Sequence, residues 1–139
     1  MNKARRKRIT SVIHTLENII DYDLIVSAKD ELEDILWEEQ DAYDNMPETL
    51  QYSIRGEESS DAIDSLQEAV DALEEAIDTL NELDDLKDEY NNSDNENDED
   101  NEDDEDEDEK LEKEAEIELK EEDINERINE AINSLEDII

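Results

Sequence analysis

The stretch that decides the fold is 61–88, which reads DAIDSLQ EAVDALE EAIDTLN ELDDLKD when written in sevens. Two columns of this heptad repeat are apolar, one mainly β-branched and one leucine: Ile63, Val70 and Ile77, then Leu66, Leu73 and Leu80. Such columns are typical of two-stranded coiled coils, although an antiparallel partner within the chain could use the same face. The pattern predicts a helix over 59–90 with these six residues as its seam.

A second helical pattern lies upstream and predicts one helix over 3–44. Its apolar residues recur at steps of three and four: Ile9, Ile13, Leu16, Ile20, Leu24, Ala28, Leu32 and Ile35. The run of fours in the middle is a stutter, which is expected to unwind a supercoil locally. His14, Tyr22 and Trp37 fall in or near this pattern, so we expect them to pack in the core or the seam.

The connection over 45–58 is expected to turn the chain back on itself. Pro47 and Glu48 suit the first turn of a short helix, because proline and acidic residues are both favoured there. Gly56 is expected to supply a left-handed or tight turn, and Ser59 or Ser60 to cap the second helix. Two long helices joined in this way predict an antiparallel hairpin.

The chain changes character over 91–109, where positions 94–109 hold 13 acidic residues and only one other residue type, Asn. We expect a disordered acidic linker that acts as a self-repelling spacer, with docking of a basic protein as the alternative. A calcium loop is disfavoured because Glu99 stands where the sharp turn needs glycine. A third amphipathic helix is expected over 110–139, either docked on the hairpin or exposed to a partner.

Composition excludes most other architectures and chemistries. The 139 residues include 50 acidic and 12 basic side chains, a formal net charge of −38, with one Gly, one Pro and no Phe. Folds rich in sheets and turns need Gly and Pro at their corners, so an all-α protein is predicted. With no Cys and one His, we expect no catalytic residue, no metal and no cofactor.

The predicted second helix carries an unusually one-sided charge. Residues 57–90 hold 14 carboxylates and one base, Lys87. At 1.5 Å rise per residue this is one charge per about 3.6 Å, close to the about 3.4 Å spacing of phosphates along one DNA strand. The expected partner-binding acidic face comprises Asp61, Asp64, Glu68, Asp71, Glu74, Glu75, Asp78 and Glu82. The alternative is a helix whose outer positions are merely solvated.

Five of the twelve bases lie within the first eight residues. The field of the whole chain opposes direct binding of nucleic acid, so these bases are expected to pair with the acidic tract or to lie near the acidic helix. No apolar run exceeds three residues, which predicts no membrane contact and a place in the cytoplasm of the host cell.

The connection carries a resemblance to a known group. DNMPETLQ at 44–51, followed by S-x-RGEESSDAIDSLQEAVDALEEAID at 53–78, resembles short acidic helical proteins of phages and prophages of Gram-positive bacteria. The similarity covers about 3–83 and is carried by Met46, Pro47, Glu48, Leu50, Gln51, Arg55 and Gly56. It implies a small accessory protein of a mobile element. The acidic tract and the third helix lie outside it, and the group implies no particular reaction.

Together these features predict a non-enzymatic phage or prophage accessory protein that binds and blocks a basic host protein through acidic helices. The expected partner handles nucleic acid, for example a nuclease, and counter-defence through DNA mimicry is the natural setting. The alternative is a structural or assembly coiled coil, in which the apolar seam forms a homodimer and the acidity serves only solubility.

Overall fold

The computed structural model describes residues 1–19, 21–96 and 105–139. Five helices and no strand occur in these ranges: α1 (Lys3–Glu17), α2 (Asp23–Asp44), α3 (Glu48–Gln51), α4 (Ile54–Glu96) and α5 (Glu105–Glu136). The prediction of an all-α protein is confirmed. The expected disordered linker over 91–109 is wrong at its two ends, because 91–96 belong to α4 and 105–109 to α5. Residues 97–104 lie outside the described residues, so their expected disorder stays a prediction.

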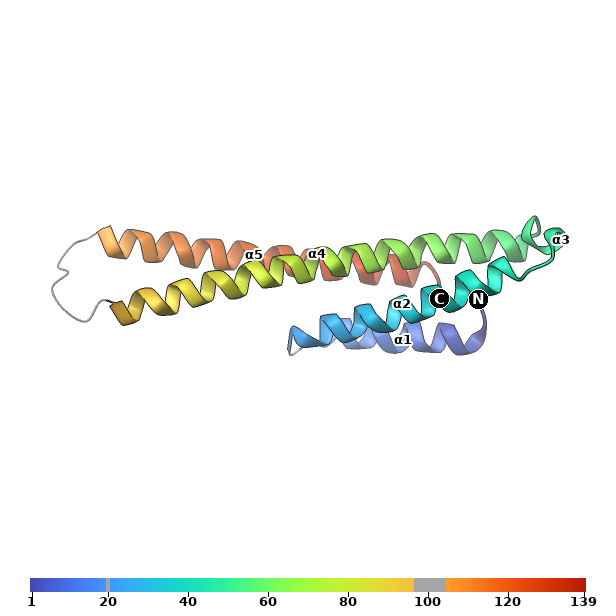
Figure 1. Cartoon of the computed structure of the whole chain (residues 1–139), viewed down its shortest axis with the longest axis horizontal. Helices are drawn as coiled ribbons and strands as arrows, with labels where there is room; N and C mark the ends of the chain where they lie inside the picture. The colour runs from blue at the N-terminus through green and yellow to red at the C-terminus, as the bar shows by residue number, and fades with distance from the viewer. Residues whose placement is uncertain (20, 97–104) are drawn as a thin grey trace.

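The helix predicted over 3–44 is wrong, because the chain reverses between α1 and α2 (Figure 1). Polar side chains satisfy the backbone at both sides of the break. The Asn18 side chain donates to the His14 carbonyl over 2.9 Å, and Asp21 accepts from the Asp23 amide over 3.1 Å. Such local bonds compete with helix continuation. The run of fours in the sequence therefore marks a chain reversal, not a stutter.

The buried face departs from the predicted series just after this reversal and meets it again at Ala28, Leu32 and Ile35. Ile9, Ile13 and Leu16 are buried in α1 as predicted, whereas α2 buries Ile25 and leaves Leu24 exposed. From Ile25 onward the buried positions of α2 follow steps of three and four: Ile25, Ala28, Leu32, Ile35 and Glu39.

The connection between α2 and α4 is shorter than predicted. Helix α4 begins at Ile54, not at 59, and ends at Glu96, not at 90. Ser59 is therefore not a cap but a buried residue inside α4. Pro47 precedes α3, with φ −56° and ψ 145°, and its carbonyl accepts from the Leu50 and Gln51 amides.

Gly56 does not form the predicted left-handed or tight turn. It lies inside α4 and does not adopt a left-handed backbone conformation. Its role is to permit a close approach: a Cβ built at Gly56 would lie 2.0 Å from the carbonyl oxygen of Gln51. The Gln51 side chain in turn donates to the Tyr43 carbonyl over 3.1 Å. Glycine thus lets α3 fold tightly onto the start of α4.

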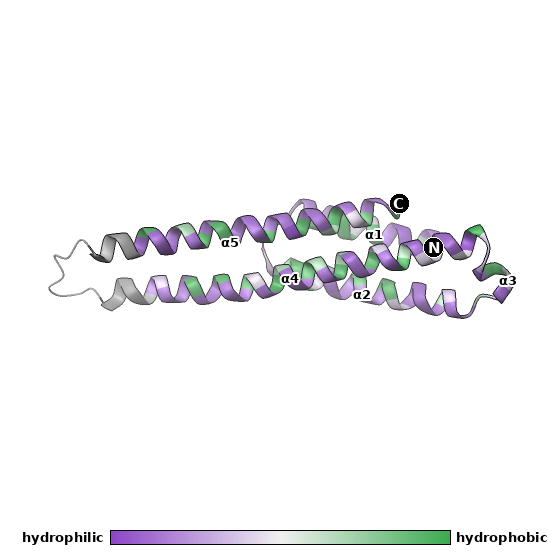
Figure 2. Ribbon diagram, turned by 90° about the horizontal axis from the view of Figure 1, so that it is seen from above, coloured by the Kyte–Doolittle hydropathy of each residue, from purple (hydrophilic) through white to green (hydrophobic). Residues whose placement is uncertain are grey.

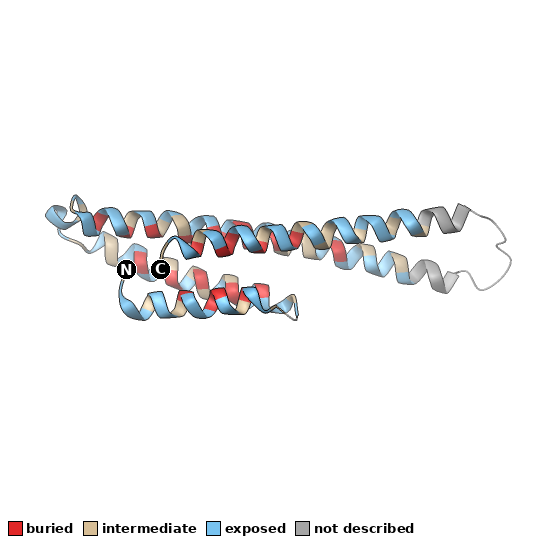
Figure 3. Cartoon of the chain, turned by 180° about the vertical axis from the view of Figure 1, so that it is seen from behind, coloured by how far each residue is buried: buried red, intermediate tan, exposed pale blue. Residues whose placement is uncertain are grey.

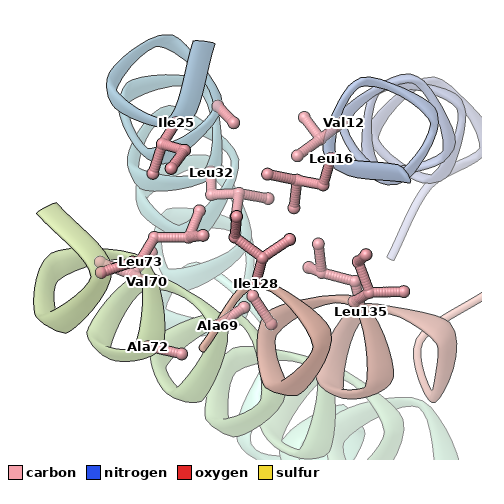
Figure 4. Packing of buried hydrophobic residues seen from close by; sticks show 14 of the residues in the cluster. Val12, Leu16, Ile25, Leu32, Ala69, Val70, Ala72, Leu73, Ile128 and Leu135 are labelled. Carbon is pink, nitrogen blue, oxygen red and sulfur yellow. The ribbon is translucent and has the colours of Figure 1, made fainter. Parts of the chain in front are cut away.

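Helices α1, α2, α4 and α5 share one apolar core at the end of the molecule that holds both termini (Figures 1 and 3). Val12 and Leu16 from α1 face Ile25 and Leu32 from α2, and residues of α4 and α5 complete the cluster (Figure 4). The third predicted helix is therefore docked. It begins at Glu105 and ends at Glu136, where 110–139 was predicted.

Helices α4 and α5 continue past the ends of α1 and α2 as a two-helix arm (Figure 1). Leu83 and Ile124 are fully buried where the arm leaves the bundle, and Lys120 Nζ lies 2.6 Å from Glu82 Oε2. Along both helices hydrophilic residues predominate and alternate with short apolar stretches (Figure 2). Leu111 and Leu119 on α5 are exposed.

Candidate protein-binding surface

The predicted seam of α4 is occupied within the chain itself. Leu66, Val70 and Leu73 are buried, whereas Ile63, Ile77 and Leu80 are half-buried. Further buried positions of α4 form an alanine column outside the six predicted seam residues: Ala62, Ala69 and Ala76, with Leu83 after it. Small residues let helices approach closely, which explains how α4 can pack on α2 on one side and α5 on the other.

All eight residues of the predicted acidic face are exposed. Seven of them belong to a longer row that runs along the outside of α4 at alternating steps of four and three. We call this row the acidic stripe: Glu57, Asp61, Asp64, Glu68, Asp71, Glu75, Asp78, Glu82, Asp85 and Glu89. Every member is exposed, so the stripe faces solvent opposite the packed side of the helix.

The eighth predicted residue, Glu74, lies beside the stripe and faces α2. Lys29 Nζ of α2 is 3.5 Å from Glu74 Oε1 and 3.0 Å from Glu33 Oε1. The hydrogen bond to Glu33, followed by the charge of both carboxylates, raises the pKa of Lys29. Glu74 therefore helps to hold α2 on α4 and is less available to a partner.

Several of the few bases of the chain form ion pairs between helices. Arg8 Nε and Nη1 lie 2.6 Å from Glu31 and Glu38, joining α1 to α2, and these hydrogen bonds raise the pKa of Arg8. Lys120 and Arg127 of α5 reach Glu82 and Glu75. Cross-helix ion pairs engage six of the twelve bases within the described ranges: Arg5, Arg8, Lys29, Lys87, Lys120 and Arg127. Arg5 and Arg8 thus pair with α2, whereas the N-terminal bases were expected to pair with the acidic tract or to lie near the acidic helix.

This use of the bases leaves much of the stripe without counter-charge. Among the described residues, Asp61, Asp64, Asp71 and Asp78 form no ion pair, and Asp71 accepts one hydrogen bond, from Gln67 over 3.0 Å. Glu68 accepts a long one from Ser134 at 3.5 Å. Neighbouring carboxylates three and four residues apart repel one another on a helix. The stripe is tolerated because the packed face of α4 stabilises the helix.

The predicted turn residues form the end of the bundle. Met46 and Gln51 are half-buried and Gly56 is buried, whereas Pro47, Glu48, Leu50 and Arg55 are exposed. This tip also exposes large apolar side chains that no sequence pattern indicated: Tyr52 is 91% and Ile54 75% exposed.

Trp37 is the clearest departure from prediction, because it is 78% exposed instead of packed in the core. The buried positions of α2 include Ile35 and Glu39, and Trp37 lies midway between them, so it points to the opposite side of the helix. Among the other two residues expected in the core, His14 is exposed and Tyr22 is half-buried.

The fold and surface define an all-α bundle with an acidic exterior and a two-helix arm. Comparison of the chain with protein-family models, curated proteins and solved structures found no match. No group of three or more metal-ligating side chains is assembled within the ranges that the structure describes. None of the helices described has both the length and the apolar character needed to cross a bilayer.

Proposed function

We propose that this chain is a non-enzymatic accessory protein of a phage or prophage that binds and blocks a basic, nucleic-acid-handling host protein. The observation that carries the proposal is the acidic stripe: ten exposed carboxylates in one row on a helix that is fixed by a packed core. A fixed row of negative charge is the feature by which a basic groove recognises a phosphate backbone.

The geometry of the stripe sharpens the DNA-mimicry hypothesis. Its average step of 3.5 residues gives one carboxylate per about 5 Å along the helix axis, a wider spacing than the about 3.4 Å of phosphates along one strand. The earlier value of about 3.6 Å counted all carboxylates of the helix, including those such as Glu74 that face a neighbouring helix. Mimicry on this surface would therefore use a continuous field of charge and not a one-to-one match to phosphates.

The experiment removes charge from the unpaired part of the stripe. The variant Asp64→Asn, Glu68→Gln, Asp71→Asn and Asp78→Asn spares Glu74, Glu75 and Glu82, whose ion pairs hold α4 to α2 and α5. The matched control, Glu116→Gln, Glu118→Gln, Glu122→Gln and Glu126→Gln, removes the same charge from exposed positions of α5. Each protein is immobilised on a resin and incubated with host lysate. The bound host proteins are then eluted with salt and identified.

Under the proposal, wild type and the α5 control retain a basic nucleic-acid-binding protein, and the stripe variant loses it while its helical circular dichroism is unchanged. The retained protein should also lose its activity on nucleic acid when wild type is added. Equal retention by the stripe variant and wild type would refute a role for the stripe.

The alternative, a structural or assembly protein, is favoured by one observation, the exposure of Leu111 and Leu119 on the arm. The predicted seam cannot support it directly, since Leu66, Val70 and Leu73 are covered by the chain's own helices. Light scattering at low and high salt tests this alternative. A dimer that forms on screening and is lost in Leu111→Gln/Leu119→Gln would favour assembly, because screening removes repulsion between two negative chains.

A further inference from the structure

We propose that the face of α2 centred on Trp37 binds an arginine-bearing basic segment of the partner protein. Trp37 is the only tryptophan of the chain, and 78% of its surface is exposed. Tryptophan is enriched among the residues that dominate binding energy at protein interfaces. An indole this exposed on a rigid helix is a feature that the fold itself does not use.

The immediate surroundings of the indole are acidic. On a helix the neighbours of Trp37 are three and four residues away, namely Glu33, Asp34, Gln40 and Asp41. Glu33 is engaged by Lys29, and Gln40 donates to Asp44 over 3.0 Å. Asp34 and Asp41 are exposed, and neither forms an ion pair with any other described residue. One unpaired carboxylate therefore lies one turn before the indole and another one turn after it.

This combination fits a guanidinium group. A guanidinium stacks flat on an indole face, and its N–H groups remain free to donate in its plane to nearby carboxylates. The two carboxylates favour a positively charged partner, because a neutral or acidic one would not offer complementary charge. A lysine ammonium gains from the same charges but stacks less well, so the geometry selects arginine over lysine.

The inference rests on the proposed function for the cationic nature of the partner. It uses α2 and not the acidic stripe of α4, so the two proposals can fail separately. Arg5 and Arg8 of the chain itself are engaged by Glu31, Glu38 and Glu39 on another side of α2, which leaves the Trp37 face to an outside cation.

The test measures affinity for nona-arginine and nona-lysine peptides by calorimetry at about 0.15 M salt, where exposed charges beyond about 8 Å are screened. We expect wild type to prefer nona-arginine by about two- to fivefold. Trp37→Leu should abolish the preference and Trp37→Phe should keep part of it, because phenylalanine retains a π face and leucine does not. Asp34→Asn/Asp41→Asn should weaken binding of both peptides.

Two controls make the outcome specific. Tyr52→Ala removes an aromatic ring that is 91% exposed at the tip of the bundle, away from the Trp37 face, and it should leave the arginine preference unchanged. The four-site stripe variant should also keep the arginine preference. If this variant no longer retains the host protein from lysate but still prefers nona-arginine, the two surfaces act independently. Trp37 is exposed, so its variants should retain wild-type circular dichroism.

Three results would overturn the inference. Wild type without an arginine preference would show that the face recognises charge alone. A preference retained in Trp37→Leu would place the arginine site elsewhere. A Trp37 emission maximum that shifts with protein concentration in the absence of peptide would show that a second copy of the chain occupies this face.

Discussion

The hydroxyl group of Ser59 donates a hydrogen bond of 2.6 Å to Oε1 of Glu39, and both side chains are buried. Arg5 Nε lies 2.9 Å from the other carboxylate oxygen, and the Met1 amino group lies 3.3 Å from Oε1. The carboxylate therefore joins α1, α2 and α4 at one end of the bundle. A buried carboxylate is tolerated here because hydrogen bonds and opposite charge replace its lost hydration.

Loss of this hydrogen bond should destabilise the fold. Ser59→Ala removes the only hydroxyl that reaches Glu39 among the described residues, so the free energy of unfolding should fall by about 1.5–3 kcal/mol, as for hydrogen bonds to charged groups. Glu39→Gln should cost more, about 3–5 kcal/mol, since it leaves Arg5 without its buried partner. Urea denaturation followed by circular dichroism measures both.

The control for that pair of variants is Ser60→Ala, at a half-buried neighbour in the same helix, because the hydrogen bond to Glu39 comes from Ser59. Its effect should stay within about 0.5 kcal/mol. If Ser59→Ala behaves like Ser60→Ala, the Ser59–Glu39 bond does not contribute to stability.

Gly56→Ala should destabilise the protein, which reverses the usual rule. In a helix interior, alanine is favoured over glycine by about 1 kcal/mol. At Gly56 the added Cβ would lie 2.0 Å from the Gln51 carbonyl oxygen, so α3 must move away from α4. We expect a lower melting temperature and faster proteolysis near 48–53. An unchanged or higher melting temperature would show that α3 is not held tightly on α4.

Ala69→Leu should disrupt the bundle because Ala69 is fully buried where α4 is packed by its neighbours. Overpacking of this kind costs about 1–3 kcal/mol or more. Ala115→Leu on α5 makes the same change at an exposed helical position and should leave stability nearly unchanged. Thermal unfolding compares the two. Equal melting temperatures would mean that the alanine column is not tightly packed.

The alanine column also shows what could be read from the sequence. Heptads over 61–88 predicted a helix and the burial of Leu66 and Leu73, because leucine repeated every seven residues is typical of the packed face of a helix. They could not show that Ala62, Ala69 and Ala76 would also be buried, since alanine is compatible with both a seam and a surface. That depends on how closely the other helices approach.

The reversal between α1 and α2 was missed for a different reason. Apolar residues continue through 18–22 at helical spacing, so periodicity alone predicts one helix. The signal lay in Asn18 and Asp21, whose side chains bond to the local backbone. The missed reversal misplaces one buried position of α2, because Leu24 was expected inside and Ile25 is buried instead. Ala28, Leu32 and Ile35 are buried as predicted, and Trp37, two residues after Ile35, lies on the opposite side of the helix.

The contribution of the cross-helix lysines to stability should be lost only at alkaline pH. Hydrogen bonds to Glu33 and Glu82 raise the pKa of Lys29 and Lys120, respectively, above the unfolded value. The stabilisation is therefore complete below about pH 10 and is lost as pH rises through the folded pKa. The difference in melting temperature between wild type and Lys29→Gln/Lys120→Gln should be constant from pH 7 to 9 and shrink above it. A difference that changes between pH 7 and 9 would contradict this assignment.

Added salt should stabilise the protein, although it weakens ion pairs. The chain carries 50 acidic and 12 basic side chains, so repulsion between carboxylates along α4 and α5 outnumbers the attractions between helices. Raising sodium chloride from about 0.01 M to 1 M shortens the Debye length from about 30 Å to 3 Å and removes most of the repulsion between exposed groups. The melting temperature should therefore rise, and it should rise less in the four-site stripe variant, which starts with less repulsion. A melting temperature that falls with salt would show that cross-helix pairs such as Lys120–Glu82 outweigh the repulsion along the stripe.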